Sequence, residues 1–330
     1  MRQILARVRA LRAEGGRAVL ATIVAVEGSA YRREGTRMLV EESGALTGVL
    51  SGGCLERDLG SKAAEVLASG VAALAVYDLR APDEILWGLG LGCGGKITVL
   101  LEKLPGDPEA PSPLDPFEQL FRDRTPATVE TRLGTEVLLR ERIVPPLRLV
   151  LAGAGRDALP LARLADELGW ETVVLDLRPT ADAAVRFAGL ARYCASSPQD
   201  LAAAVTIDNF TAAVVLTHNY LDDLAWLAAL LPSAAPYVGL LGPPERRDRL
   251  LGDLAMQGLV LDEAMRARLR GPAGLPLGGR SPAEVALAIA AEIQAVVIES
   301  GESSAASGIG ALSLSRSRVD ASRALSEERP

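Results

Sequence analysis

The sequence is poor in cysteine and lysine, and it has no long hydrophobic run. Its three cysteines are too few for a disulfide framework, which favours a reducing, cytoplasmic location. Only three of its 35 basic residues are lysines, and 42 acidic residues give it a net charge of -7. A nucleic-acid-binding protein is usually basic, so we expect no nucleic-acid partner. No stretch approaches the 18 apolar residues that a membrane helix needs, so we expect no membrane span.

The length and the element pattern predict two domains. At about 150 residues per domain, 330 residues correspond to two. We expect an α/β protein with an N-terminal mixed α/β domain and a C-terminal Rossmann-like domain, which is a doubly wound parallel sheet. The Pro-rich stretch after residue 104 predicts a linker. The expected parts are a domain over 1–104, a linker with a short helix and hairpin over 105–146, the Rossmann-like domain over 147–300, and a disordered tail over 301–330.

A glycine turn between a strand and a helix marks the Rossmann-like domain. The segment from Leu149 to Ala158 contains G-x-G-x-x-A, in which Gly153 permits the tight turn and Gly155 lets a pyrophosphate approach the helix. Asp176 follows 21 residues after Gly155, where a carboxylate would bind a ribose hydroxyl. This pattern predicts a phosphate- and ribose-binding site.

Two glycine-rich segments in the first domain each contain a cysteine. Gly52 and Gly53 precede Cys54 at the start of an expected helix, where backbone amides favour a thiolate. Cys93 lies between Gly92 and Gly94, in a segment whose amides can form an anion-binding nest. The alternative interpretation is a small buried cysteine in a tight turn for Cys54 and a floppy hairpin loop for the segment of Cys93. Two cysteines cannot alone supply the four ligands of structural zinc.

Two further candidates follow expected strands of the Rossmann-like sheet. His218, the one histidine of the chain, follows an apolar strand at the carboxyl edge, where open α/β sheets bind ligands. A histidine beside a helix cap is the alternative. Gly242 lies in a glycine turn before two arginines, which suits a phosphate; a solvated helix start is the alternative.

Taken together, these segments resemble the XdhC/CoxI family, the accessory proteins of molybdenum hydroxylases such as xanthine dehydrogenase. Five blocks carry the resemblance in the expected order: 51–56, 90–95, 217–218, 239–242 and 279–284. The resemblance covers nearly the whole chain to about residue 300. One position departs from it, because family members often carry His after the Rossmann glycines, where this chain has Arg156.

The resemblance implies a cytosolic chaperone that binds molybdenum cofactor, protects it and helps to insert it into a client hydroxylase. It implies a molybdenum–sulfur contact at Cys54 or Cys93 and cofactor binding by the glycine-rich segments. It also implies a sulfurtransferase partner and a homodimer. The expected cofactor-binding residues are Gly52, Gly53, Cys54, Gly92, Cys93, Gly94, Gly153, Gly155, Arg156, Asp176, His218 and Gly242.

Two other functions fit parts of the sequence. An oxidoreductase that binds NAD(P) or another dinucleotide would account for Gly153, Gly155 and Asp176, with His218 as the one evident acid–base group. A scaffold protein that contacts the hydroxylase without holding cofactor is the second alternative.

Overall fold

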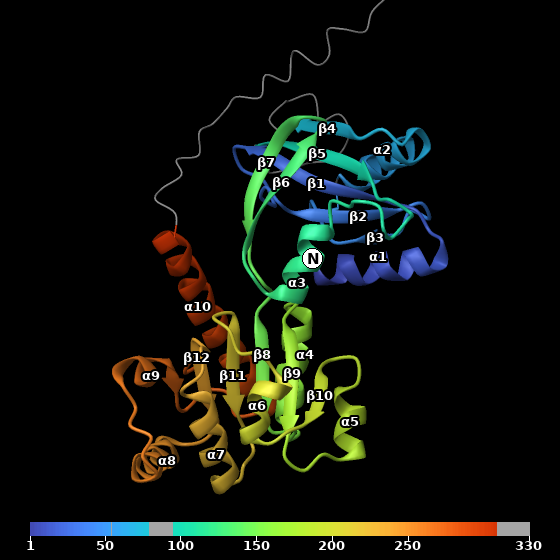
Figure 1. Cartoon of the computed structure of the whole chain (residues 1–330). Helices are drawn as coiled ribbons and strands as arrows, with labels where there is room; N and C mark the ends of the chain where they lie inside the picture. The colour runs from blue at the N-terminus through green and yellow to red at the C-terminus, as the bar shows by residue number, and fades with distance from the viewer. Residues whose placement is uncertain (54, 79–94, 309–330) are drawn as a thin grey trace, which may run out of the picture. The chain divides into compact units, whose positions relative to one another are not determined.

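The protein divides into two compact units, which we describe separately. The structure is a computed structural model that describes residues 1–53, 55–78 and 95–308. The first unit is Met1–Pro146 and the second is Leu147–Pro330 (Figure 1). Among the described residues, no helix is both long and apolar enough to cross a membrane.

The first unit contains a five-stranded antiparallel sheet in the order β3-β2-β1-β5-β4. Helix α2 packs on one face of this sheet, and helices α1 and α3 contribute to the core on the other face. The central strand β1 is buried on both faces over residues 18–24, where every residue except Thr22 is apolar. The elements are α1 (Arg2–Glu14), β1 (Ala18–Glu27), β2 (Arg37–Glu41), β3 (Leu46–Thr47), α2 (Glu56–Ser69), β4 (Ala73–Asp78), β5 (Lys96–Lys103) and α3 (Asp115–Asp123).

The segment 105–146 differs from the expected linker. It contains α3 and the antiparallel hairpin of β6 (Ala127–Leu133) and β7 (Glu136–Ile143), as the sequence predicts. However, its apolar side chains are buried in the same core as α1: these are Leu114, Phe117, Leu120, Val129 and Ile143. Burial of large apolar side chains stabilises a fold, so this segment belongs to the first unit.

The second unit is a Rossmann-like domain, which confirms the expected fold class. Its six strands are all parallel, in the order β10-β9-β8-β11-β12-β13. With β8 as the first strand this order is 3-2-1-4-5-6. The order in which strands are added to the sheet therefore reverses between β8 and β11. The strands are β8 (Arg148–Ala152), β9 (Glu171–Asp176), β10 (Arg192–Ala195), β11 (Thr211–Val215), β12 (Tyr237–Leu240) and β13 (Leu269–Arg270).

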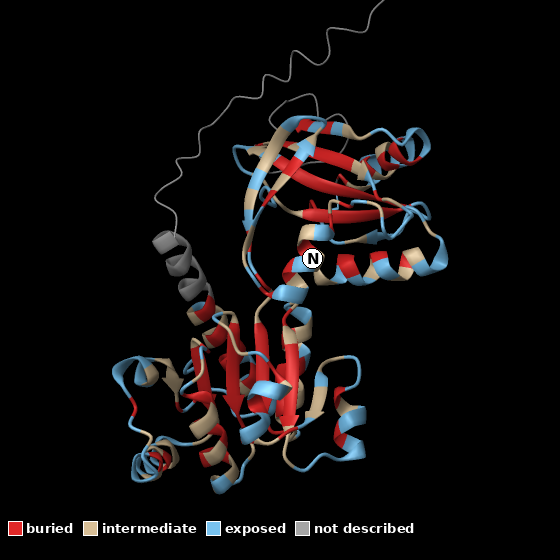
Figure 2. Cartoon of the chain, in the orientation of Figure 1, coloured by how far each residue is buried: buried red, intermediate tan, exposed pale blue. Residues whose placement is uncertain are grey.

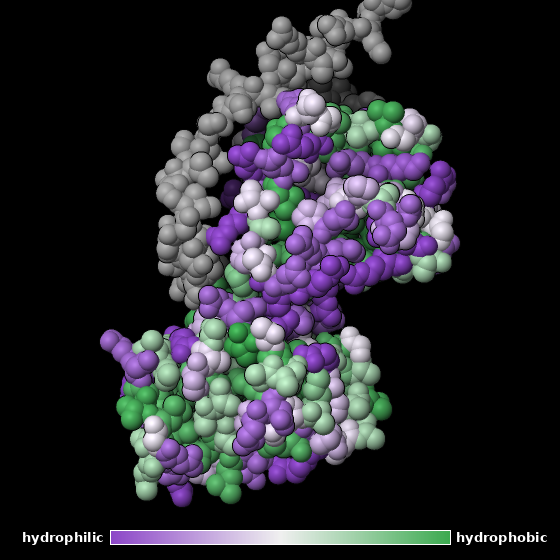
Figure 3. All heavy atoms as spheres, in the orientation of Figure 1, coloured by the Kyte–Doolittle hydropathy of each residue, from purple (hydrophilic) through white to green (hydrophobic). Residues whose placement is uncertain are grey.

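Helices cover both faces of this parallel sheet, and the strands between them are buried (Figure 2). Helices α4 and α10 pack on one face, and α7 and α8 pack on the other. Figure 3 shows apolar and polar residues mixed on the visible face of this unit. The helices are α4 (Ala158–Glu167), α5 (Ala181–Phe187), the 3₁₀ turn η2 (Pro198–Asp200), α6 (Leu201–Ala204), α7 (Tyr220–Leu230), α8 (Pro244–Met256), α9 (Glu263–Arg268) and α10 (Pro282–Gly308).

Helix α10 corrects the expected start of the disordered tail. It begins at the capping box that the sequence predicts, in which Ser281 and Glu284 bind each other's backbone amides. It continues to Gly308, so 301–308 is helical. Ala305 and Ala306 favour this extension, because alanine has the highest helix propensity. The rest of the expected tail, 309–330, lies outside the described residues.

Candidate functional site

The glycine turn after β8 depends on glycine for two different reasons. Gly153 has a φ of 121°, and a Cβ there would lie 2.8 Å from the carbonyl oxygen of Leu216. At Gly155 the backbone is not strained, and the reason is steric: a Cβ there would lie 3.3 Å from Asp157 Oδ1, which is a tight contact. Since Leu216 directly follows β11, the turn packs against the end of the neighbouring strand. This is the point at which the strand order of the sheet reverses.

A short polar contact joins the two loops that meet at this point. His218 Nε2 lies 2.7 Å from Asp157 Oδ2, and a Cβ at Gly155 would lie 3.8 Å from that same nitrogen. His218 has a φ of 59°, which is unusual for a residue other than glycine. The sequence predicts His218 as a site residue but not Asp157, whose only signal is its place directly after the glycine turn.

Asp176 ends β9, as predicted, and its carboxylate is held by two donors. Its Oδ2 accepts a hydrogen bond from the Tyr193 hydroxyl at 2.9 Å, and its Oδ1 accepts one from the Arg178 amide at 3.1 Å. The Tyr193 hydroxyl in turn accepts a hydrogen bond from the Thr180 amide. Burial and the bond to Asp176 raise the pKa of Tyr193 above its ordinary value, so the hydroxyl remains a donor at neutral pH.

A pocket of about 240 Å³ lies between the glycine turn and Asp176. Two arginines line it. Arg178 forms an ion pair with Asp222, and Arg186 donates to the Ala154 carbonyl at 3.0 Å. The Nε of Arg186 is buried without a hydrogen-bond partner, so a ligand acceptor could satisfy it. The pocket is lined by Gly153, Ala154, Gly155, Asp176, Leu177, Arg178, Thr180, Ala183, Arg186, Thr217, Asp222 and Trp226.

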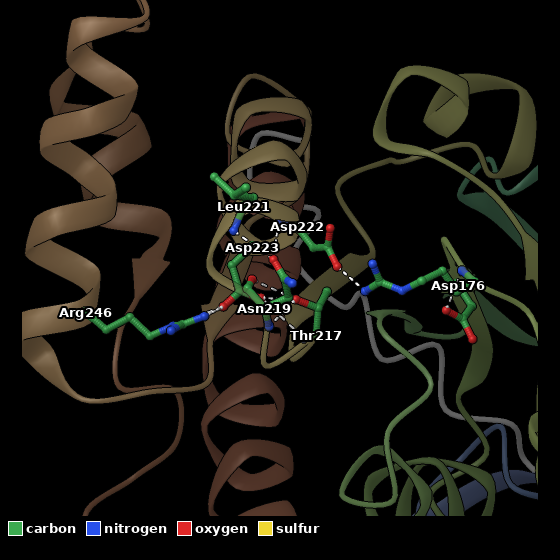
Figure 4. A network of polar contacts seen from close by, with 8 residues as sticks. Asp176, Thr217, Asn219, Leu221, Asp222, Asp223 and Arg246 are labelled. Atoms are coloured by element: carbon green, nitrogen blue, oxygen red, sulfur yellow. Dashed lines mark hydrogen bonds and ion pairs between the residues drawn. The ribbon is translucent and has the colours of Figure 1, made fainter.

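A buried carboxylate fixes the loop after β11 (Figure 4). Asp223 is 1% exposed, and its Oδ1 accepts hydrogen bonds from the Thr217 hydroxyl at 2.5 Å and from the Thr217 amide. Its Oδ2 accepts hydrogen bonds from Arg246 at 2.6 and 3.1 Å. Asn219 caps α7 through the amides of Leu221 and Asp222. The loop that carries His218 is therefore held in place from α7 and α8.

Three predicted residues lie outside the pocket lining. Gly242 has a φ of 145°, and a Cβ there would lie 2.9 Å from Arg246 Cδ, so it gives room to that side chain. His218 lies beside the pocket, where its side chain contacts Asp157. Arg156 is exposed and has no ion pair or hydrogen bond within the described part of the chain. The sequence analysis missed Arg178, Arg186 and Tyr193, which can be recognised only once β9 and β10 are paired.

In the first unit, the turn before α2 is fixed by hydrogen bonds of Ser51, and its two glycines face space that the described residues do not fill. The buried Ser51 accepts hydrogen bonds through Oγ from the amides of Gly53 and Leu55. The Glu56 carboxylate accepts hydrogen bonds from the amide and the hydroxyl of Ser51. A Cβ at Gly52 or Gly53 would meet no atom of the described residues within 4 Å, so these residues leave the backbone open to a ligand.

The two cysteines predicted as site residues of the first unit cannot be placed. Cys54, Gly92, Cys93 and Gly94 lie outside the described residues. From their glycine-rich turns, the sequence predicts that Cys54 and Cys93 lie near each other on one face of the first domain, and this stays a prediction. Among the described residues, no group of three or more His, Cys, Asp or Glu side chains could hold a metal ion.

Comparisons with known proteins match both units. Residues 11–78 match the model of the XdhC and CoxI family, and residues 149–293 match that of the XdhC Rossmann domain. A relative from Bacillus subtilis, named as a probable xanthine dehydrogenase subunit, is 30% identical over 312 residues, which are 84% of this chain and 92% of the relative. The molybdenum cofactor insertion chaperone PaoD of Escherichia coli is 28% identical over 305 residues, 88% of this chain and 86% of that protein.

A solved structure agrees with these relatives. The crystal structure of a xanthine dehydrogenase from Bacillus halodurans has a TM-score of 0.72 and 29% sequence identity. The match covers 89% of this chain and 96% of that chain, so it includes both units. The resemblance that the sequence motifs indicate is thereby confirmed, and the chain belongs to the XdhC and CoxI family.

Proposed function

We propose that this protein is an accessory chaperone that binds molybdenum cofactor and helps to insert it into a molybdenum hydroxylase. One observation carries the proposal: the chain matches, over 88% of its length, a relative named as a molybdenum cofactor insertion chaperone. The Bacillus subtilis relative is named for xanthine dehydrogenase, which makes a hydroxylase of that class the client we propose.

The Rossmann-like unit supplies a binding site for the phosphate and nucleotide part of this cargo. Gly153 and Gly155 line the pocket at the start of α4, where helix amides favour a phosphate. Asp176 has both carboxylate oxygens oriented by neighbours and can accept further hydrogen bonds from a ribose. The buried Nε of Arg186 offers an additional donor. These features support a ligand with phosphate and hydroxyl groups.

The cysteine-containing segments are proposed to hold the metal end of the cargo. A thiolate at Cys54 or Cys93 is the soft ligand that metal–sulfur chemistry favours. Gly52, Gly92 and Gly94 would leave backbone amides accessible to phosphate oxygens, whereas the Gly53 amide already donates to Ser51 Oγ. The open space at Gly52 and Gly53 supports this part of the proposal, because no side chain among the described residues fills it.

The names of the relatives favour a chaperone over an NAD(P)-dependent oxidoreductase or a scaffold that binds no cofactor. The finer expectations are proposals that rest on the family resemblance. They are a cytoplasmic location, a sulfurtransferase partner and a homodimer. Size-exclusion chromatography with light scattering measures the last of these, and a monomer at micromolar concentration would contradict it.

Reconstitution of a hydroxylase tests the function. Apo-hydroxylase is incubated with protein loaded with molybdenum cofactor, either wild type or carrying Cys54→Ser or Cys93→Ser. We expect the wild type to restore activity faster than free cofactor does, and at least one variant to lose this advantage. Cys194→Ser is the matched control, because Cys194 lies on β10 of the other unit. No acceleration by the wild type would contradict the chaperone function, and full activity of both variants would contradict the sulfur contact alone.

A further inference from the structure

Several loops of the first unit meet at one end of its sheet. Strand β1 ends at Glu27 opposite Lys96 at the start of β5, and Asp78 at the end of β4 is paired with the same Lys96. Tyr77 on β4 donates a 2.6 Å hydrogen bond to Asp58 in the first turn of α2. Helix α2 therefore begins at this end, which we call the α2 end. It comprises 27–35, 51–53, 55–58, 77–78 and 95–96.

The hairpin between β1 and β2 is packed into the α2 end. Ala30 contacts the core cluster that includes Leu50 and Leu55, which flank the Ser51 turn. A Cβ at Gly95 would lie 2.3 Å from the Ser29 carbonyl oxygen, so the backbone that leads into β5 lies directly against the hairpin. The hairpin, the Ser51 turn and the start of β5 thus close the same end of one sheet.

Three arginines at the α2 end have free hydrogen-bond donors. Arg32, Arg33 and Arg57 are exposed, and none has an ion pair or hydrogen bond to any residue that the structure describes. Arg32 lies 5.2 Å from the ring centroid of Tyr31, which is itself 60% exposed. That contact uses the face of the guanidinium group and leaves its N–H donors available.

The acidic side chains of the α2 end, Asp78 included, each have a partner within the protein. Glu34 accepts a hydrogen bond from the Val26 amide, and Glu56 accepts two from Ser51. Asp58 accepts one from Tyr77, and Glu27 lies 3.3 Å from Lys96. These carboxylates are held by the fold, whereas the three guanidinium groups are not. The free donors at this end are therefore suited to an anion from outside the protein.

We propose that Tyr31, Arg32, Arg33 and Arg57 bind the phosphate-bearing pterin part of the cargo. This inference rests on the proposed function and adds residues that carry it. Guanidinium groups bind phosphate oxygens in a bidentate manner, and an exposed aromatic ring stacks on a flat heterocycle. The open backbone at Gly52 and Gly53 lies at the same end, and it directly precedes Cys54 in the sequence.

A charge-matched pair of variants of the full chain tests the proposal. The first is Arg32→Gln/Arg33→Gln/Arg57→Gln. The control, Arg9→Gln/Arg122→Gln/Arg163→Gln, removes three exposed arginines from α1, α3 and α4. Binding of molybdenum cofactor, released from a denatured molybdenum enzyme, is titrated anaerobically. We expect the first variant to bind at least tenfold more weakly than the wild type, and the control to bind within twofold of it.

Two further measurements separate the outcomes. The salt dependence of binding should decrease in the first variant and not in the control, because fewer charge contacts are made. Tyr31→Leu should weaken binding about fivefold, whereas Tyr31→Phe, which keeps the ring, should not. Equal binding by the wild type and the first variant would overturn this proposal and leave the chaperone function standing. If the wild type binds no cofactor, both proposals fail. Unchanged circular dichroism shows that the variants are folded.

Discussion

The pocket of the Rossmann-like unit and the α2 end of the first unit are built in opposite ways. Around the pocket, Asp176 is fixed by Tyr193 and Arg178, and the neighbouring loop by the buried Asp223. At the α2 end, the arginines have free donors and the glycines face open space. A prearranged site selects a ligand by its shape, because little conformational entropy is lost on binding. A site with free charges attracts an anion first and orders around it.

The largest expected effect comes from adding one methyl group to a glycine of the pocket. Gly153→Ala forces a Cβ to within 2.8 Å of the Leu216 carbonyl oxygen at a φ of 121°. We expect a loss of about 4 kcal/mol of unfolding free energy, from backbone strain and overpacking together. Urea unfolding followed by circular dichroism measures it.

Gly52→Ala is the matched control for this comparison. A Cβ at Gly52 meets nothing within 4 Å, so stability should change by less than about 0.5 kcal/mol. Similar losses in both variants would show that the two sites do not differ in rigidity as we describe.

The buried carboxylate on α7 gives the next effect. Asp223→Ala leaves Arg246 without its partner and removes both bonds to Thr217, so we expect a loss of about 3 kcal/mol. The adjacent Asp222→Ala breaks only the ion pair with the exposed Arg178, for which we expect about 1 kcal/mol or less. Thermal unfolding of both variants makes the comparison, and equal decreases would contradict the role of Asp223 in fixing the loop.

A change at the pocket should affect binding rather than stability. Asp176→Asn keeps the shape of the side chain and removes its charge, so binding of the nucleotide portion should weaken about tenfold, as for a lost hydrogen bond to a charged group. Calorimetry with a molybdopterin dinucleotide measures this change. Asp248→Asn, on the exposed end of an ion pair with Arg247 in α8, serves as a control that should bind as the wild type does. Undiminished affinity of Asp176→Asn would remove Asp176 from the site.

The smallest effect concerns the opposite end of the first sheet, where Arg7 donates two hydrogen bonds to Glu41. These bonds lower the pKa of Glu41 below its ordinary value of 4.5. The resulting stabilisation is present above about pH 4.5 and is lost as the pH falls through the lower, folded-state pKa. Arg7→Met should therefore lower the Tm by a few degrees at pH 7 and hardly at all at pH 3. An equal decrease at both pH values would show that packing, and not the charge pair, is responsible.

The sequence predicted the Rossmann-like unit well because its signals are local. Gly153, the strand before it and the acid at Asp176 lie within one stretch of chain, and each has a fixed meaning in this fold. Helix α10 was predicted to end too early because composition alone suggested a disordered tail. The segment 105–146 was expected to be a linker, since its prolines are visible in the sequence while its packing partners on α1 are not.

The contacts that shape both sites could not be predicted from the sequence, because they join residues that only the folded sheet brings together. Asp157 and His218 are 61 positions apart, and only the pairing of β8 with β11 brings their loops together. Tyr193 reaches Asp176 across two paired strands. Arg32, Arg33 and Arg57 look like ordinary surface charges until the ends of β1, β5 and α2 are placed together.

The central claim, that this chain holds molybdenum cofactor as cargo, is tested most directly by anaerobic titration of the full-length wild type with that cofactor. We predict saturable binding with one cofactor per chain, a weaker affinity at high salt, and release of the bound cofactor to an apo-hydroxylase. The absence of saturable binding, under conditions in which the apo-hydroxylase itself takes up the same cofactor, would contradict the account.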